Sequence, residues 1–168
     1  MADRFDFQSI YEDETWTVVM DDVSNIQERF YEIITNHCKK SEFPNLSVRV
    51  EDYITGGLFF NKEATKMLKI KAINSSFNKF EIFYRAQVFG KVVVFSRMEC
   101  MERTFLTALS GKTGKELKAH FRMRCKNMAQ YEEFIAIDSL ANILFDMALF
   151  ELDPSYTTVR TSSTKSVA

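Results

Sequence analysis

The sequence predicts a single α+β domain over residues 13–153, built on an antiparallel sheet of about four to five strands. We expect one helix after the first strand and two C-terminal helices packed on the sheet. Three observations predict this class. Strand-like runs fill most of the first hundred positions, one helical pattern interrupts them early, and helical patterns follow the last strand. A long C-terminal helix across the sheet would resemble a helix-grip arrangement.

The first elements are an arm, a strand and a helix. Residues 1–12 are polar and acidic and are expected to form an acidic N-terminal arm. The stretch 15–21 is rich in β-branched and aromatic residues, which predicts the first strand. Ser24 and Gln27 have the spacing of a capping box. Apolar residues then recur at helical spacing to about residue 39, so a helix is predicted there.

Strands and a long hairpin follow. Alternation predicts strands over 46–54 and 66–73, and residues 77–101 predict a hairpin that turns at Gly90 and Lys91. This turn places Phe83 opposite Met98. Both faces of the hairpin are then apolar, whereas a strand that meets water alternates with polar residues. We therefore expect the hairpin to be covered on both faces, or to keep one face for a partner.

The C-terminal third is predicted to form helices and a tail. Thr113 and Glu116 have capping-box spacing and predict a helix to about residue 127. A second helix is expected over 130–152, ended by Asp153 and Pro154. Residues 154–168 hold eight Ser or Thr in fifteen positions, which predicts a disordered tail.

The stretch "LSGKTGKE" (109–116) ends like a nucleotide-binding P-loop but does not complete the motif. The position that requires the first glycine is Leu106, and the extra glycines that let backbone amides wrap a phosphate are missing. The letters are better explained by a turn at Gly111 and a helix cap at Thr113.

Charge is unevenly distributed along a chain whose net charge is −1. Residues 102–128 hold seven bases and two acids, whereas residues 129–153 hold six acids and no base. The bases at helical spacing form a basic stripe: Lys115, Lys118, Arg122 and Lys126. It is either a solvated helix face or a contact for an acidic protein. Nucleic acid is the less favoured partner, because no aromatic residue interleaves with the bases.

Two apolar groups are further candidate sites. Leu58, Phe59 and Phe60 follow a glycine pair, so they form either a short strand or tucked loop, or a lid or partner anchor. The second group would line a ligand cavity between the sheet and the last helix: Phe80, Ile82, Tyr84, Phe95, Arg97 and Leu144. The alternative is that this second group is packed core, with Arg97 in a structural ion pair with Glu99 or Glu81.

No catalytic constellation is visible, and no metal or cofactor is expected. His37 and Cys38 are adjacent and diverge by about 100° on a helix. The three cysteines show no paired spacing for zinc and suit a reducing, cytoplasmic compartment. No apolar run is long enough to cross a membrane.

These observations favour a non-catalytic protein–protein interaction module, or a subunit of a larger assembly, that uses an apolar sheet face and the basic stripe. Its partner would be another protein or a second copy of the chain. The alternative is a small-molecule-binding domain with an apolar cavity.

Overall fold

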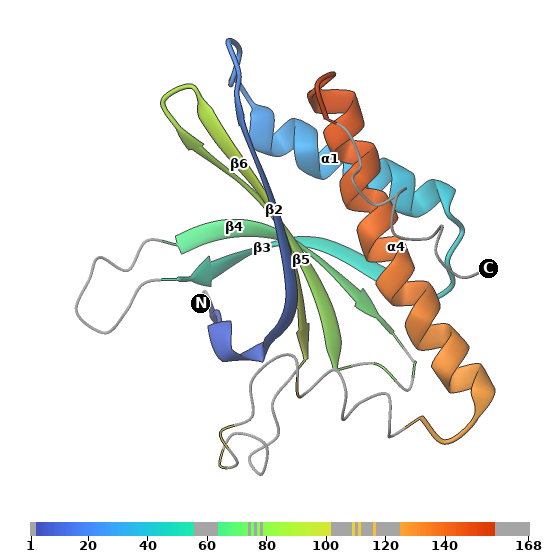
Figure 1. Cartoon of the computed structure of the whole chain (residues 1–168). Helices are drawn as coiled ribbons and strands as arrows, with labels where there is room; N and C mark the ends of the chain where they lie inside the picture. Colours follow the sequence, from blue (N-terminus) through green and yellow to red (C-terminus); the bar gives the residue numbers. More distant parts are fainter. Residues whose placement is uncertain are drawn as a thin grey trace, which may run out of the picture.

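The structure is a computed structural model that describes residues 3–55, 64–73, 75, 77, 79–101, 109, 111, 116 and 125–156 (Figure 1). Its elements are β1 (Asp3–Arg4), a 3-10 turn (Phe7–Ser9), β2 (Ile10–Val19), α1 (Ile26–Lys40), β3 (Leu46–Ile54), β4 (Ala64–Ala72), β5 (Phe80–Phe89), β6 (Val92–Met101) and α4 (Met128–Leu152). The α+β class predicted from the sequence is confirmed, with one helix after an early strand and one at the C-terminal end.

The described strands form one six-stranded sheet in the order β1-β3-β4-β5-β6-β2. Neighbours run antiparallel, except that β1 pairs in parallel with β3. The sequence predicted about four to five strands, because a two-residue strand such as β1 shows no alternation. Most of the segment predicted as the first C-terminal helix, 113–127, lies outside the described residues.

The central hairpin has the predicted register. Phe83 pairs with Met98 and Tyr84 with Arg97, and the turn residue Gly90 has a φ of 63°. Such a positive φ is readily adopted by glycine and strained for most other residues. Because side chains alternate between the faces, this register sends Tyr84 and Arg97 to one side of the sheet and Phe83 and Met98 to the other.

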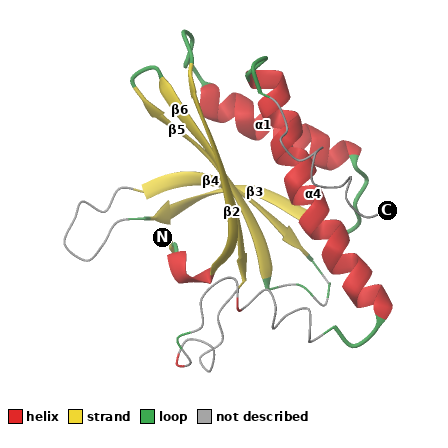
Figure 2. Cartoon of the chain, viewed as in Figure 1, coloured by secondary structure: helices red, strands yellow, loops and turns green. Residues whose placement is uncertain are grey.

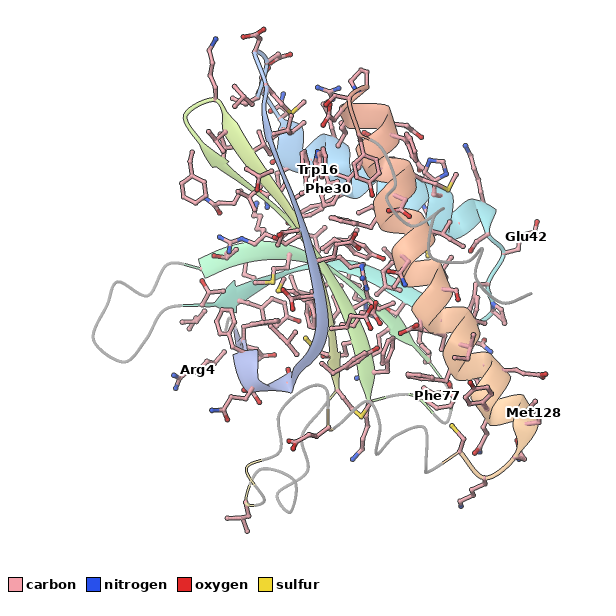
Figure 3. All side chains as sticks on the ribbon, viewed as in Figure 1. Arg4, Trp16, Phe30, Glu42, Phe77 and Met128 are labelled. Atoms are coloured by element: carbon pink, nitrogen blue, oxygen red, sulfur yellow. The ribbon has the colours of Figure 1, made fainter. Side chains whose placement is uncertain are left out.

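Both described helices cover one face of the sheet (Figure 2). Figure 3 shows Trp16 and Phe30 in the layer between the strands and the helices. The Phe30 ring of α1 lies 4.9 Å from Phe95 of β6 and 6.1 Å from Phe145 of α4, measured between ring centroids. The Tyr84 hydroxyl donates a hydrogen bond to the carbonyl oxygen of Ala141 at 2.8 Å. These contacts join sheet, α1 and α4 into the main core.

The opposite face of the sheet is covered in part by the N-terminal segment. The sequence assigned residues 1–12 to an arm, but Phe5 is buried, and its ring meets Phe83 at 5.1 Å and Tyr53 at 6.0 Å. Together with Met67 and Met98, these rings form a second, smaller core. The apolar second face of the hairpin is therefore partly filled by the chain itself, while Phe89 at its tip remains 62% exposed.

Helix α1 lies where the sequence predicted it, but the predicted capping box at its start is wrong. Asn25 is the N-cap, in a left-handed conformation without a side-chain cap. Ser24 instead donates from both its backbone N–H and its hydroxyl to the Asp22 carboxylate. Gln27 donates to the Tyr31 hydroxyl and to the carbonyl oxygen of Lys66. The capping box fails because the Ser24 hydroxyl, which it requires, donates to the nearby Asp22 carboxylate.

Candidate functional site

Several predicted site residues fall outside the described part of the chain. These are the apolar loop, Leu58, Phe59 and Phe60, and three members of the basic stripe, Lys115, Lys118 and Arg122. The fourth member of the stripe, Lys126, is exposed just before α4. Its backbone N–H donates to the side-chain oxygen of Gln130 at 2.8 Å. Lys126 therefore lies next to the start of α4.

The six residues predicted to line a ligand cavity lie together between the sheet and the helices. Each is at most 1% exposed: Phe80, Ile82, Tyr84, Phe95, Arg97 and Leu144. The aromatic members contact other rings of the core, with Phe80 5.9 Å from Phe134 and Tyr84 6.4 Å from Phe145 between centroids. A ligand between the sheet and α4 would have to displace these side chains.

Arg97 lies in a buried ion cluster at the β2–β6 side of the sheet. Its guanidinium pairs with the fully buried carboxylate of Glu99. It also lies 3.3 Å from Glu14 Oε2 and 3.7 Å from Glu12 Oε1 on β2. The predicted structural pair of Arg97 with Glu99 is confirmed. Glu81, the other suggested partner, pairs with Lys71 at 3.1 Å instead.

An irregularity in β2 brings further groups to this cluster. The β2–β6 register shifts between Ile10 and Glu12, so an extra residue enters the strand at Tyr11. A bulge of this kind redirects side chains. The Tyr11 hydroxyl donates to Glu99 Oε2 at 2.6 Å, while the neighbouring Glu12 reaches Arg97. The side chains of Tyr11 and Glu12, although adjacent in the strand, therefore lie on the same face of the sheet.

The chemistry of the cluster is that of an anchor. Burial, above all, raises the pKa of Tyr11, so its hydroxyl stays protonated and donates. Arginine is protonated at any ordinary pH. The cluster therefore holds charges and hydrogen bonds in place between β2 and β6. Sequence reasoning missed Tyr11, which it assigned to the arm; the alternation of Trp16, Glu14 and Glu12 toward one face could have extended the strand.

Helix α4 is apolar on its outward side as well as its inward side. Nine buried residues line the inward side: Phe134, Ile137, Leu140, Ala141, Leu144, Phe145, Ala148, Leu149 and Leu152. On the outward side, Ile143 is 51% exposed, Met147 39% and Phe150 51%. Their spacings of four and three residues align them on one face of the helix. We call Ile143, Met147 and Phe150 the outer row.

The residues after α4 hold Phe150 in place. Trp16 Nε1 on β2 donates to Asp153 Oδ2 at 2.8 Å. The buried Tyr156 ring then lies 5.0 Å from Trp16 and 5.1 Å from Phe150 between centroids. The Tyr156 hydroxyl donates to Asp146 Oδ1 at 2.6 Å. Tyr156, which the sequence assigned to a disordered tail, is thus packed, whereas Pro154 and Ser155 are exposed and 157–168 lie outside the described residues.

A hollow of about 370 Å³ opens beside the outer row, between α4 and β2. It is lined by Glu12, Ser139, Asn142, Ile143 and Asp146. On the other side of the row, Glu151 Oε1 lies 2.5 Å from His37 Nε2. Carboxylates therefore lie on both sides of the row, and we call Glu12, Asp146 and Glu151 the acidic rim.

Among the residues that the structure describes, no group of three or more His, Cys, Asp or Glu side chains could hold a metal ion. Within the same ranges, neither α1 nor α4 is long and apolar enough to cross a membrane.

Comparison of the chain with family models, with curated proteins and with solved structures finds no significant match.

Removing the cation of the buried cluster tests the anchor. Arg97→Met leaves Glu99 buried without its partner, so we expect a loss of about 3–5 kcal/mol in the free energy of unfolding, measured by urea denaturation. Replacing both residues, in Arg97→Met/Glu99→Leu, should recover much of this loss because no uncompensated buried charge remains. Lys91→Met, which removes an exposed pair with Asp21, is the control and should leave the midpoint nearly unchanged. Equal losses in the single and double variants would contradict this account.

The Asp153 carboxylate should make stability depend on pH. Burial alone would raise its pKa, but hydrogen bonds from Ser155 and Trp16 outweigh burial and lower the pKa. Its contribution is therefore present above the unfolded pKa near 4 and is lost as the pH falls through the lower folded value. We expect Asp153→Asn to be about 1–3 kcal/mol less stable than wild type at pH 7. This deficit should shrink below about pH 4 in urea denaturation; a constant deficit down to pH 3 would refute it.

Proposed function

We propose that this protein is a non-catalytic interaction module that holds another protein on the outward face of α4. The observation that carries the proposal is the outer row, three large apolar side chains in line on a helix whose opposite side is already buried. A helix that is apolar all round is normally buried on all sides. A partner that covered the row would remove this apolar surface from water.

The composition and rigidity of the row suit an interface. Aromatic residues and methionine are enriched at the centres of protein interfaces. Phe150 rests against Tyr156, which is itself held by Trp16 and Asp146. A side chain ordered before binding loses less conformational entropy when a partner arrives. The row runs over eight residues, 143–150, a rise of about 10 Å along the helix at 1.5 Å per residue, which fits the centre of an interface.

A different protein is the favoured occupant rather than a second copy of the same face. Residues 129–153 contain six acids and no base, and Glu12 of β2 adds another acid beside the hollow. Two identical faces would bring acid against acid, which opposes association. A second copy is therefore the less favoured occupant and forms one outcome of the test below.

This proposal moves the contact surface from the one that the sequence suggested. The apolar sheet face is partly covered by Phe5, and its exposed remainder lies near Phe89 at the hairpin tip. The basic stripe stays a hypothesis for a second contact, with Lys126 its one described member. The sequence shows that apolar residues surround this helix, but only the packed neighbours identify Ile143, Met147 and Phe150 as its exposed members.

Site-specific photo-crosslinking tests the docking face. A photoreactive phenylalanine analogue at position 147 should trap a defined partner in extracts of the native cells, and the same analogue at position 89 should not. With that partner purified, we expect Ile143→Ser/Met147→Ser to weaken binding about 10- to 100-fold in calorimetry, which corresponds to about 1.4–2.8 kcal/mol for the two contacts together.

Phe89→Ser is the matched control, because Phe89 is similarly exposed but lies on the hairpin tip. It should change the dissociation constant less than about twofold. Equal weakening by the Phe89 variant, or no adduct from position 147, would refute the proposal. A crosslinked adduct of two copies of this chain would show that the partner is a second copy of the chain and not a different protein.

A further inference from the structure

The outer edge of strand β2 lies beside the outer row and further defines the kind of partner. The sheet ends at β2, so one side of this ten-residue strand pairs with β6, and within the described residues no strand pairs with the other side. We propose that the partner presents an extended segment, which pairs with residues 15–19 of β2 as an additional strand and packs alternate side chains against the outer row. This inference rests on the proposed function and specifies the occupant of the same face.

Backbone groups on this edge point away from the sheet. The Met20 N–H donates to the carbonyl oxygen of Lys91 at 2.9 Å, so Met20 is bonded toward β6. In an antiparallel pair every second residue makes such bonds, and the register between β2 and β6 is unbroken beyond the bulge. Thr15, Thr17 and Val19 therefore direct their N–H and C=O groups outward. A further strand is the protein element whose own backbone pairs with a row of this kind.

The residues of this edge are suited to pairing. Edge strands are commonly protected by lysine, by proline, by shortness or by a bulge. Strand β2 contains neither lysine nor proline, its bulge lies near its start at Tyr11, and its last acid is Glu14. Residues 15–19 are threonine, tryptophan and valine, which favour strands. On the opposite edge of the sheet, β1 already occupies part of β3.

The outer row lies on the β2 side of α4. Ile143 lines the hollow together with Glu12 of β2. Phe150 contacts the Tyr156 ring, which in turn contacts Trp16 of β2. A strand paired with β2 would lie about 4.8 Å from it and point every second side chain toward the helices. The partner segment therefore needs an apolar side chain at alternate positions. A helix on the outer row would cover the same side chains but leave the backbone groups of β2 unpaired.

Amide hydrogen exchange of the full-length protein, followed residue by residue by NMR, tests the added strand. The probe is the purified partner that position 147 captures. In the free protein we expect the outward amides of Thr15 and Thr17 to exchange faster than those of Trp16 and Val18, which are bonded to β6. Addition of the partner should slow exchange at Thr15 and Thr17 at least about tenfold. Unchanged exchange at these two amides would refute the added strand.

Proline substitution gives a second, independent test. Thr17→Pro removes an outward N–H without breaking a bond to β6, and we expect it to weaken binding of the partner at least about tenfold in calorimetry. Val50→Pro is the matched control, since the Ile73 N–H donates to the Asn45 carbonyl and the same alternation turns Val50 away from β4 on the opposite edge. It should change the dissociation constant less than about twofold.

Two further variants guard this comparison. Thr17→Ala keeps the backbone N–H and should bind nearly as well as wild type, which separates the backbone from the side chain. Circular dichroism spectra of every variant must match wild type. Thr15→Pro replaces Thr17→Pro if that variant unfolds, because both residues point outward.

The outcomes distinguish the inference from the function beneath it. If position 147 captures a partner whose affinity Thr17→Pro leaves unchanged, the docking face stands and the added strand is refuted. If position 147 captures no partner, both proposals fail. Outward amides that are already protected in the isolated protein would also overturn the partner strand. Protection that falls on dilution would then assign the covering strand to a second copy, and protection independent of concentration would assign it to this chain itself.

Discussion

The buried guanidinium of Arg97 organises the side of the molecule that carries the candidate site. It gathers carboxylates from β6 and β2, and the Tyr11 hydroxyl completes the set through Glu99. These bonds hold β2 against the rest of the sheet. Trp16, farther along β2, then holds Asp153 at the end of α4. The position of Phe150 therefore depends on an ion cluster that lies several contacts away.

A buried ion cluster of this kind fixes the register of β2 in the sheet more than it adds to the free energy of unfolding. Burying charges costs desolvation energy that mutual attraction barely offsets. A slip of one residue in β2 would, however, turn Glu12 and Glu14 away from Arg97 and expose the apolar partners of Trp16. The bulge at Tyr11 fits this interpretation, because it adjusts the strand so that adjacent side chains reach the same charge. Edge strand β2 is thus specified by polar contacts on one face.

Sequence patterns were sufficient to predict the elements whose contacts lie between residues close together in the chain. The Gly90-Lys91 turn set the hairpin register, and periodicity located α1 and α4. They failed where a contact is distant in the chain, since β1 forms only by pairing with Tyr53 and Ile54. They also failed where two groups compete for the same partner, since Ser24 donates to Asp22 and does not cap α1. For the site, the pattern predicted that Arg97 pairs with Glu99 or Glu81, and the structure shows that the partner is Glu99. The pattern could not separate the buried from the exposed side of α4, since both sides are apolar and only the packed neighbours distinguish them.

The contact between Trp16 and Tyr156 has a spectroscopic consequence. Trp16 is the single tryptophan of the chain, and its indole lies against a ring that in turn touches Phe150. Indole emission responds to nearby dipoles and to access of water, both of which change when a neighbouring surface is covered. The unlabelled protein therefore carries its own optical reporter at the end of the outer row, two rings from the position where a partner would dock.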